Sequence, residues 1–191
     1  MPYDARLAPT PAATLHRLTL HATERDAEVA PGVRQRIWTC GGTAPGPTLR
    51  GKVGDLFEVI LVNDGTMAHG VDFHAGQTAP DQAMRSLEPG ESLVYRFRAD
   101  HSGAWFYHCS TMPMMAHIAN GMYGAVIIDP PGLPKVDREY VLVASQLYPG
   151  SKCGGADLGA LRRGDWAAAM FNGYPDQYVH APSIVGEQEL P

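Results

Sequence analysis

Short stretches in which hydrophobic and polar residues alternate recur along the chain. Residues 15–22 place leucine and alanine on one face of an extended segment and arginine, threonine and histidine on the other. A period of two is typical of a β-strand with one buried face. Residues 93–99 alternate in the same way, and residues 55–63 (DLFEVILVN) are mostly apolar and rich in β-branched side chains, as in a buried strand. Further short strands are predicted over 104–108 and 124–128.

Turn-forming residues separate these stretches. Glycine, proline, asparagine and serine favour the backbone angles of tight turns, and they cluster between the predicted strands. The clusters are Pro45-Gly46-Pro47, Asn63-Asp64-Gly65, Pro89-Gly90, Ser102-Gly103 and Pro130-Pro131-Gly132. Many short strands with few helical patterns are typical of a sandwich or barrel. The sequence therefore predicts an all-β fold, an antiparallel sandwich with Greek-key connections.

The chain divides into three parts at its turns. Residues 1–14 form an N-terminal tail before the first strand, and residues 15–130 contain all the strands of the predicted sandwich. The turn at Pro130-Pro131-Gly132 is the predicted exit from this domain. Residues 131–191 follow as a linker with further elements, too poor in apolar segments after Tyr174 to build a second core.

Three elements are predicted beyond the exit. Residues 140–147 form a strand, and residues 169–173 begin another. Residues 158–169 are a candidate short helix, because alanine and leucine favour helices and Asp157 can cap the N-terminus.

Composition and charge narrow the range of functions. Hydrophobic residues make up 45% and charged residues 18% of the chain, as in an ordinary globular protein. The net charge of −5 argues against a nucleic-acid-binding surface, which needs clustered basic residues. No apolar run reaches the length of a membrane span. The N-terminus lacks the basic and apolar regions of a signal peptide, so we expect a cytoplasmic chain, a processed chain, or one without its export signal.

Four residues in two segments have the chemistry of a copper site. His69 opens the segment HGVDFH, and Cys109 is followed by His117 and then by Met122. A thiolate, two imidazoles and a weak thioether are the ligands of electron-transfer copper centres. Singly, each residue is more often a hydrogen-bonded histidine, a buried thiol or a core methionine. The four together, in this order, predict a mononuclear cysteine-ligated (type 1) copper site in the sandwich domain.

Strand geometry predicts a second metal site. Adjacent residues in a strand point to opposite faces, so His108 faces away from any metal that Cys109 binds. Asp72 and His74 stand at odd offsets from His69 and also turn away if that segment is extended. These three side chains are therefore expected together on the outer side of the sheet, on the order of 10 Å from the first metal. The Cys109–His108 link would be the electron path between the two.

These segments resemble the first cupredoxin domain of copper-containing nitrite reductases. The family's three copper motifs are similar to HGVDFHA (69–75), FYHC (106–109) and HIANGMYGAVIIDP (117–130). The passage into the family's second domain resembles GLPKVDREYVLV (132–143) and FNGY (171–174). The resemblance extends from about residue 45 to residue 180 and implies a cupredoxin β-sandwich followed, over residues 131–191, by the incomplete start of a second cupredoxin-like domain.

The resemblance also implies a role for each candidate residue. Asp72 would hydrogen-bond nitrite and deliver protons, where the plainer alternative is a strand-edge hydrogen-bond acceptor. The implied ligands are His69, Cys109, His117 and Met122 for type 1 copper, and His74 and His108 for type 2 copper. Laccase-type multicopper oxidases are related, but they need paired histidines for a trinuclear copper cluster. Asp72 and Ser110 stand at two of those positions, so the sequence predicts against such a cluster.

Further partners and residues follow from the same resemblance. In the family, the second domain of a neighbouring subunit supplies the third type 2 histidine. We therefore expect a homotrimer, a redox donor protein, and a periplasmic or extracellular location. The remaining histidines are expected to be ordinary surface residues, with His180 the one most able to reach a neighbour. They are His16, His21, His101 and His180.

Three functions remain open on the sequence. The first is an enzyme that reduces nitrite to nitric oxide at type 2 copper. The second is a blue-copper electron carrier without catalysis, and the third is a fragment of a longer oxidase. Met112, Met114 and Met115 are expected to pack around the copper, or alternatively to form a docking surface for a redox partner. Cys40 and Cys153 either pair or remain free thiols.

Overall fold

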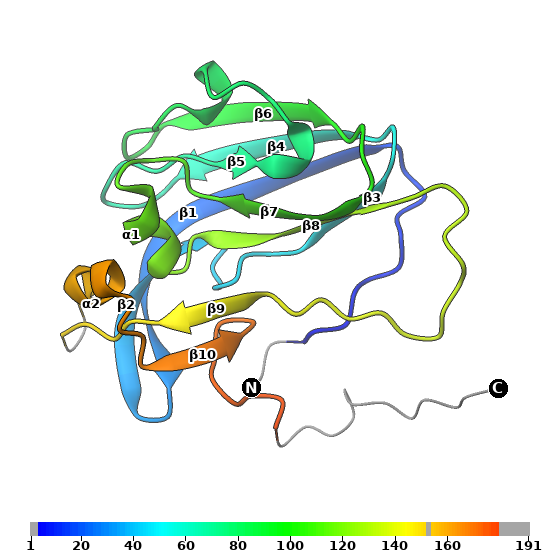
Figure 1. Ribbon diagram of the computed structural model, residues 1–191. Coiled ribbons are helices and arrows are strands. Elements are labelled where there is room, and N and C mark those ends of the chain that lie inside the picture. The colour runs from blue at the N-terminus through cyan, green and yellow to red at the C-terminus, as the bar shows by residue number, and fades with distance from the viewer. Residues whose placement is uncertain (1–3, 152–153, 180–191) are drawn as a thin grey trace.

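The computed structural model describes residues 4–151 and 154–179 and is a β-sandwich of two four-stranded sheets (Figure 1). The first sheet has the order β2–β1–β4–β6, and the second has the order β3–β8–β7–β5. The strands of the first are β1 Leu15–Ala30, β2 Val33–Cys40, β4 Leu56–Asn63 and β6 Ser92–Arg98. Those of the second are β3 Leu49–Lys52, β5 Asp72–Phe73, β7 Gly103–His108 and β8 Tyr123–Asp129. The predicted all-β sandwich is confirmed, but it is not wholly antiparallel, because β1 pairs with β4 and β3 with β8 in parallel.

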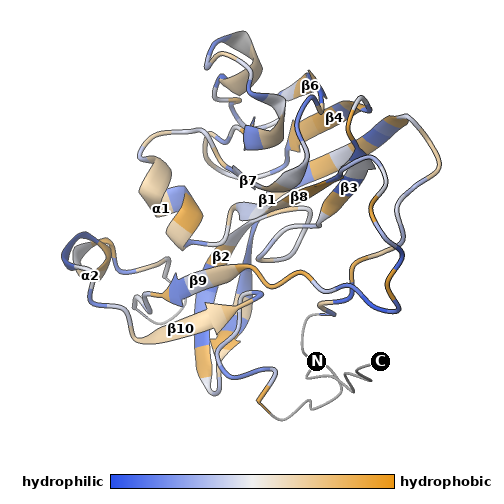
Figure 2. Cartoon of the chain, turned by 45° about the vertical axis from the view of Figure 1, so that its right-hand side comes forward, coloured by the Kyte–Doolittle hydropathy of each residue, from blue (hydrophilic) through white to orange (hydrophobic). Residues whose placement is uncertain are grey.

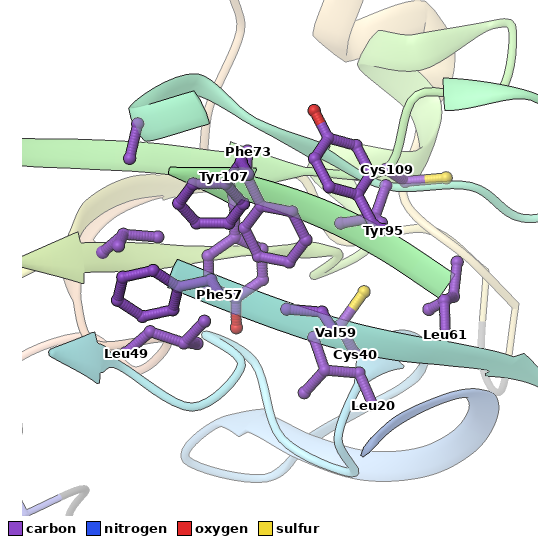
Figure 3. Close-up of a cluster of buried hydrophobic side chains, with 14 of the residues drawn as sticks. Leu20, Cys40, Leu49, Phe57, Val59, Leu61, Phe73, Tyr95, Tyr107 and Cys109 are labelled. Atoms are coloured by element: carbon purple, nitrogen blue, oxygen red, sulfur yellow. The ribbon is translucent and has the colours of Figure 1, made fainter. Parts of the chain in front are cut away.

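Alternating side chains build the core between the sheets. Along β4, Phe57, Val59 and Leu61 point inward and are buried, whereas the residues between them face outward. Strand β6 repeats the pattern with Tyr95 and Phe97, and the rings of Phe57 and Phe97 stack 4.8 Å apart. Figure 2 shows the polar and apolar residues along these strands, and Figure 3 shows the aromatic centre of the core. Burial of this apolar surface is the main force that holds the sheets together.

The second sheet is anchored by Tyr107 of β7. Its ring is fully buried, and its hydroxyl donates to the carbonyl of Pro47 at 2.8 Å. A Cβ on Gly124 of the neighbouring strand would lie 2.4 Å from this ring, so only glycine fits there. Cys40 also lies in the core as a free thiol, and burial raises the pKa of its side chain (Figure 3). Cys153, the other half of the possible pair, lies outside the described residues.

Strand β1 is longer than its sequence pattern predicts. It continues past Ala22 to Ala30, through a polar stretch in which apolar periodicity is weak. Residues 15–22 pair with β4 in parallel, and residues 22–30 pair with β2 in an antiparallel hairpin. Pairing with β2, which the pattern did not identify, therefore extends the strand where local periodicity does not.

The elements beyond residue 130 pack against the far end of that hairpin. Strands β9 (Ala144–Leu147) and β10 (Ala168–Phe171) form a two-stranded sheet, and Leu147 and Met170 contact Val29 and Ile37. The strand predicted over 140–147 is thus wrong in its first half, where Val143 instead donates its N–H to the side chain of Asn172.

The two α-helices are short and lie close to each other at one end of the molecule (Figure 1). They are α1 (Met114–Ala119) and α2 (Leu158–Arg163). Asp157 caps α2 as predicted, but the helix ends at Arg163 rather than at residue 169. Gly164 follows with φ of 73°, a left-handed conformation that terminates helices. Within residues 4–151 and 154–179, no helix has the length and apolar character to cross a membrane.

Candidate metal centres

Three donor side chains meet at one end of the sandwich core. Nδ1 of His69 lies 3.3 Å from Nδ1 of His117, and the same nitrogen of His117 lies 3.3 Å from Sγ of Cys109. All three residues are buried, and their donor atoms lie within 4.8 Å of one another. The structure thus brings together three of the four residues assigned to the first copper. We call this set the inner cluster.

The backbone links the inner cluster to Met122, the fourth assigned residue. Cys109 directly follows β7, and His117 lies in α1. The N–H of Met122 donates to the carbonyl of His117 at 3.1 Å, and the N–H of Cys109 donates to the carbonyl of Met122 at 3.0 Å. Met122 is fully buried in the same apolar cluster as Cys109. The loop from 109 to 122 is therefore closed on itself around the donor atoms.

A carboxylate that the sequence analysis missed orients His69. Nε2 of His69 lies 3.0 Å from Glu24 of β1, which also accepts from the backbone N–H of Thr66. A proton on Nε2 leaves Nδ1 free to face the other donors, as in many carboxylate–histidine–metal arrangements. Burial raises the pKa of Glu24, but the hydrogen bonds from His69 and Thr66 outweigh it and leave that pKa below its usual value. No sequence signal marks Glu24, because it lies in the polar half of β1.

Burial favours the neutral forms of two inner donors, His117 and Cys109, in the protein without metal. Burial, together with the nearby His69, lowers the pKa of His117 to about 4, so this imidazole is uncharged at neutral pH. Burial raises the pKa of the Cys109 thiol, against hydrogen bonds from the N–H groups of Gly70 and Thr111. Neutral imidazoles are ready metal ligands, and a metal ion would take the place of the thiol proton. The donor set fits a soft or borderline transition metal such as copper.

The methionines that precede His117 in the loop do not all lie where the sequence predicted. Met112 and Met115 are 75% and 63% exposed, so the prediction that they pack around the site is wrong for both. Helix α1 turns Ala116 and His117 inward, which leaves Met115 on the outside. Trp38 of β2 takes the adjacent position, with its ring edge-on to His117 at 4.8 Å between centroids. Sequence analysis missed Trp38, because nothing local marks its contact with α1.

Asp72, His74 and His108 form a second group, the outer cluster. Nε2 of His74 lies 3.0 Å from Nε2 of His108, and 3.6 Å from the carboxylate of Asp72. Asp72 and His108 stand opposite each other in the β5–β7 ladder. His74 opens a 3₁₀ turn (His74–Gly76) rather than continuing the strand, yet its ring still reaches the group. The structure thus brings together the three residues assigned to the second metal.

The outer cluster has one orienting contact and one open side. Nδ1 of His108 lies 2.9 Å from the carbonyl of Cys109, and with a proton on that nitrogen Nε2 is the atom that could bind a metal. His108 is nearly buried, with the ring of Phe106 5.3 Å away, whereas the His74 side chain is 44% exposed. The group contains two imidazoles and one carboxylate among the described residues. Two imidazoles make a weak site with room for further ligands.

The remaining histidines have other contacts. His16 is not the surface residue that was expected, because its side chain is nearly buried and lies 2.7 Å from Asp55. His21 is exposed beside Asp64, and His101 is exposed. His180 lies outside the described residues. Ser110, at one of the positions considered for a trinuclear cluster, donates to the carbonyl of Met84 at 2.8 Å.

Comparisons with known proteins agree with this geometry. The profile of the multicopper oxidase family matches residues 21–132. A copper-containing nitrite reductase from Neisseria gonorrhoeae is 35% identical over 178 residues, which cover 91% of this chain and 45% of the relative. One from Pseudomonas chlororaphis is 40% identical over 129 residues, covering 61% of this chain and 36% of the relative. The chain therefore spans about half the length, or less, of the curated relatives it matches.

Solved structures give the same result. A copper nitrite reductase from Nitrosomonas europaea superimposes with a TM-score of 0.78 at 40% identity, covering 84% of this chain and 57% of the other. A copper-containing nitrite reductase from Thermus scotoductus gives a TM-score of 0.76 at 27% identity, covering 88% and 40%. These similarities confirm the predicted cupredoxin fold.

Proposed function

Because the chain belongs to the multicopper oxidase family, we propose that it is a copper redox protein of the nitrite-reductase type, with two copper sites. His69, Cys109, His117 and Met122 would bind type 1 copper, and His74 and His108 would bind type 2 copper. One observation carries this proposal. Two donor clusters occur on either side of a single peptide bond, between His108 and Cys109.

The reaction requires both clusters. Reduction of nitrite to nitric oxide consumes one electron and two protons and releases water. Copper would supply one-electron chemistry at both clusters. The electron would enter at the inner cluster, and nitrite would be activated at the outer cluster. The short covalent link from Cys109 to His108 gives the electron a direct route between the clusters. The inner donors are all buried, which would limit the rearrangement that accompanies a change of charge.

Asp72 is the proposed proton donor to nitrite. Two observations support this role: its carboxylate lies 3.6 Å from Nε2 of His74 in the outer cluster, and its side chain is partly exposed. Side chains that transfer protons in this way contribute typically 10²–10⁴-fold to a rate. Asp72 would bind nitrite by a hydrogen bond and deliver protons to the departing oxygen.

A second candidate function follows from the openness of the outer cluster. Two imidazoles and a carboxylate form a weak copper site, so the chain by itself would act as an electron carrier with one copper. For the enzyme we therefore propose a homotrimer, in which a neighbour completes the outer site. The proposal also includes a redox donor protein and a periplasmic or extracellular location.

Copper content, electron paramagnetic resonance and nitrite turnover test the proposal together. If the chain is the proposed enzyme, we expect two coppers per chain, one with small hyperfine splitting and one with normal splitting. Nitrite turnover should fall about 10²–10⁴-fold in Asp72→Asn. Asp81→Asn, a change at an exposed carboxylate that caps a 3₁₀ turn (Gln82–Met84), is the matched control and should leave turnover intact. One copper per chain and equal background turnover in wild type and Asp72→Asn would favour the carrier.

A further inference from the structure

The four residues between His117 and Met122 are tied to a distant part of the chain. Asn120, in the middle of this span, is 3% exposed. Its Oδ1 accepts a hydrogen bond from the N–H of Ala156 at 2.7 Å, and its Nδ2 donates to the carbonyl of Ala116 at 2.7 Å. Both ends of a buried amide are thus used, one within the copper loop and one across to the segment Gly154–Ala156.

The backbone adds two further bonds to this junction. The carbonyl of Asn120 accepts from the N–H of Trp38, and the carbonyl of Gly154 accepts from the N–H of Arg36, both at 2.9 Å. The end of the copper loop is therefore held between β2 on one side and residues 154–156 on the other. We call these contacts the Asn120 brace.

Helix α1 depends on such support. It is six residues long, and helices of this length are unstable on their own. The Asn120 side chain gives the carbonyl of Ala116 a second hydrogen bond, in addition to the one from the backbone N–H of Asn120 at 3.1 Å, and so reinforces the last turn of the helix. The next ligand, Met122, follows Asn120 by two residues and is bonded through its N–H to His117. Movement of Asn120 would therefore change the distance between these two ligands.

The brace is closely packed on the far side as well. A Cβ on Gly155 would lie 2.7 Å from Oδ1 of Asn120, which is too close for any carbon. The amide is held by hydrogen bonds at both ends and cannot turn aside without loss of one of them. Gly155→Ala would therefore push on the copper loop from outside the loop.

From these contacts we infer that Asn120 is a positioning residue, through which the segment Gly154–Ala156 sets the geometry of the His117–Met122 pair. The inference rests on the proposed type 1 copper site. Its physical basis is that the axial ligand of such a site tunes the potential and the colour, so a small shift of Met122 has a spectroscopic effect. Residues beyond the sandwich domain thereby act on the electron-transfer centre.

The test compares Asn120→Ala and Gly155→Ala with a matched control, all in the full chain loaded with copper. Asn172, like Asn120, is a buried asparagine with both ends of its amide bonded, but its partners here, Val141 and Val143, lie outside the copper loop. Asn172→Gly removes these bonds, and glycine tolerates the φ of 51° at that position. We expect both brace variants to shift the visible spectrum and the reduction potential, with copper affinity about 10–100-fold lower, and Asn172→Gly to leave all three unchanged.

A second readout needs no metal. In the copper-free protein, amide hydrogen exchange at Met122 and Cys109 should become on the order of tenfold faster in the brace variants, as for loss of one buried hydrogen bond. If wild type has no blue band that depends on Cys109, the proposed copper site is wrong. Amide hydrogen exchange would still show whether the Asn120 brace holds the loop. Unchanged exchange in both brace variants, or an equal spectral shift in Asn172→Gly, would overturn the brace.

Discussion

The inner and outer clusters use similar side chains in opposite environments. The inner donors come from two segments, the one that contains His69 and the loop from 109 to 122, and all are buried. The outer donors include a half-exposed histidine, and only His108 is buried. A dry and crowded site suits storage of one electron, whereas a site with free space suits binding of a substrate. The comparison shows that two candidate donor clusters with different burial lie on either side of one peptide bond, between His108 and Cys109.

The largest expected effect comes from removing the inner sulfur. Cys109→Ala should abolish the intense visible absorption, because that band is a thiolate-to-copper charge transfer and requires the Cu–S bond. Cys40→Ala is the matched control, since it removes another buried thiol from the same core and should leave the colour. Visible spectra of both copper-loaded variants give the answer. Colour that survives in Cys109→Ala would show that the thiolate ligand has been wrongly assigned.

The next effect tests whether the clusters are separate. His108→Ala should empty the outer site and keep the blue band, whereas His117→Ala should damage the blue site and spare any outer copper. The physical reason is that His108, the last residue of β7, and Cys109, which follows it, belong to different donor clusters. Copper content and visible spectra should be measured on both variants, with folding checked by circular dichroism. If a folded His108→Ala has no blue band, the two residues serve one site.

The structure also shows why sequence analysis identified some features and missed others. Strand β4 and the candidate ligands Cys109, His117 and Met122 were identified from the sequence, because β4 has a local apolar pattern and the three candidates are spaced within one loop. Strand β2 was not identified, because its pairing with β1 depends on the partner strand rather than on an apolar pattern of its own. Glu24 and Trp38 were missed for a related reason. Both reach the inner cluster only after the sheets have formed, so nothing local marks them.

A smaller effect is expected from the second layer of the inner cluster. Glu24→Gln removes the charge that accepts from His69 while keeping a similar shape, and it should lower copper affinity there about 10–100-fold. The outer copper should be unaffected. Glu58→Gln is the control, because Glu58 is bonded to Arg17 and Arg96 on the outer face of the first sheet. Competition with a chelator measures the affinities, and equal losses in the two variants would count against a specific role for Glu24.

The smallest effect is expected at Met122, the proposed axial ligand of the type 1 copper. Met122→Gln should keep the blue colour and the copper, because the thiolate and the two imidazoles supply most of the binding. It should change the hue and the reduction potential, because the axial ligand tunes these sites rather than holding the metal. Met112 is the control, because it is exposed whereas Met122 is fully buried. Met112→Gln should change neither the hue nor the reduction potential. Visible spectra and potentiometric titration of both variants distinguish the cases. Loss of copper from Met122→Gln would show that the thioether is a structural ligand, and an unchanged potential would show that it does not reach the metal.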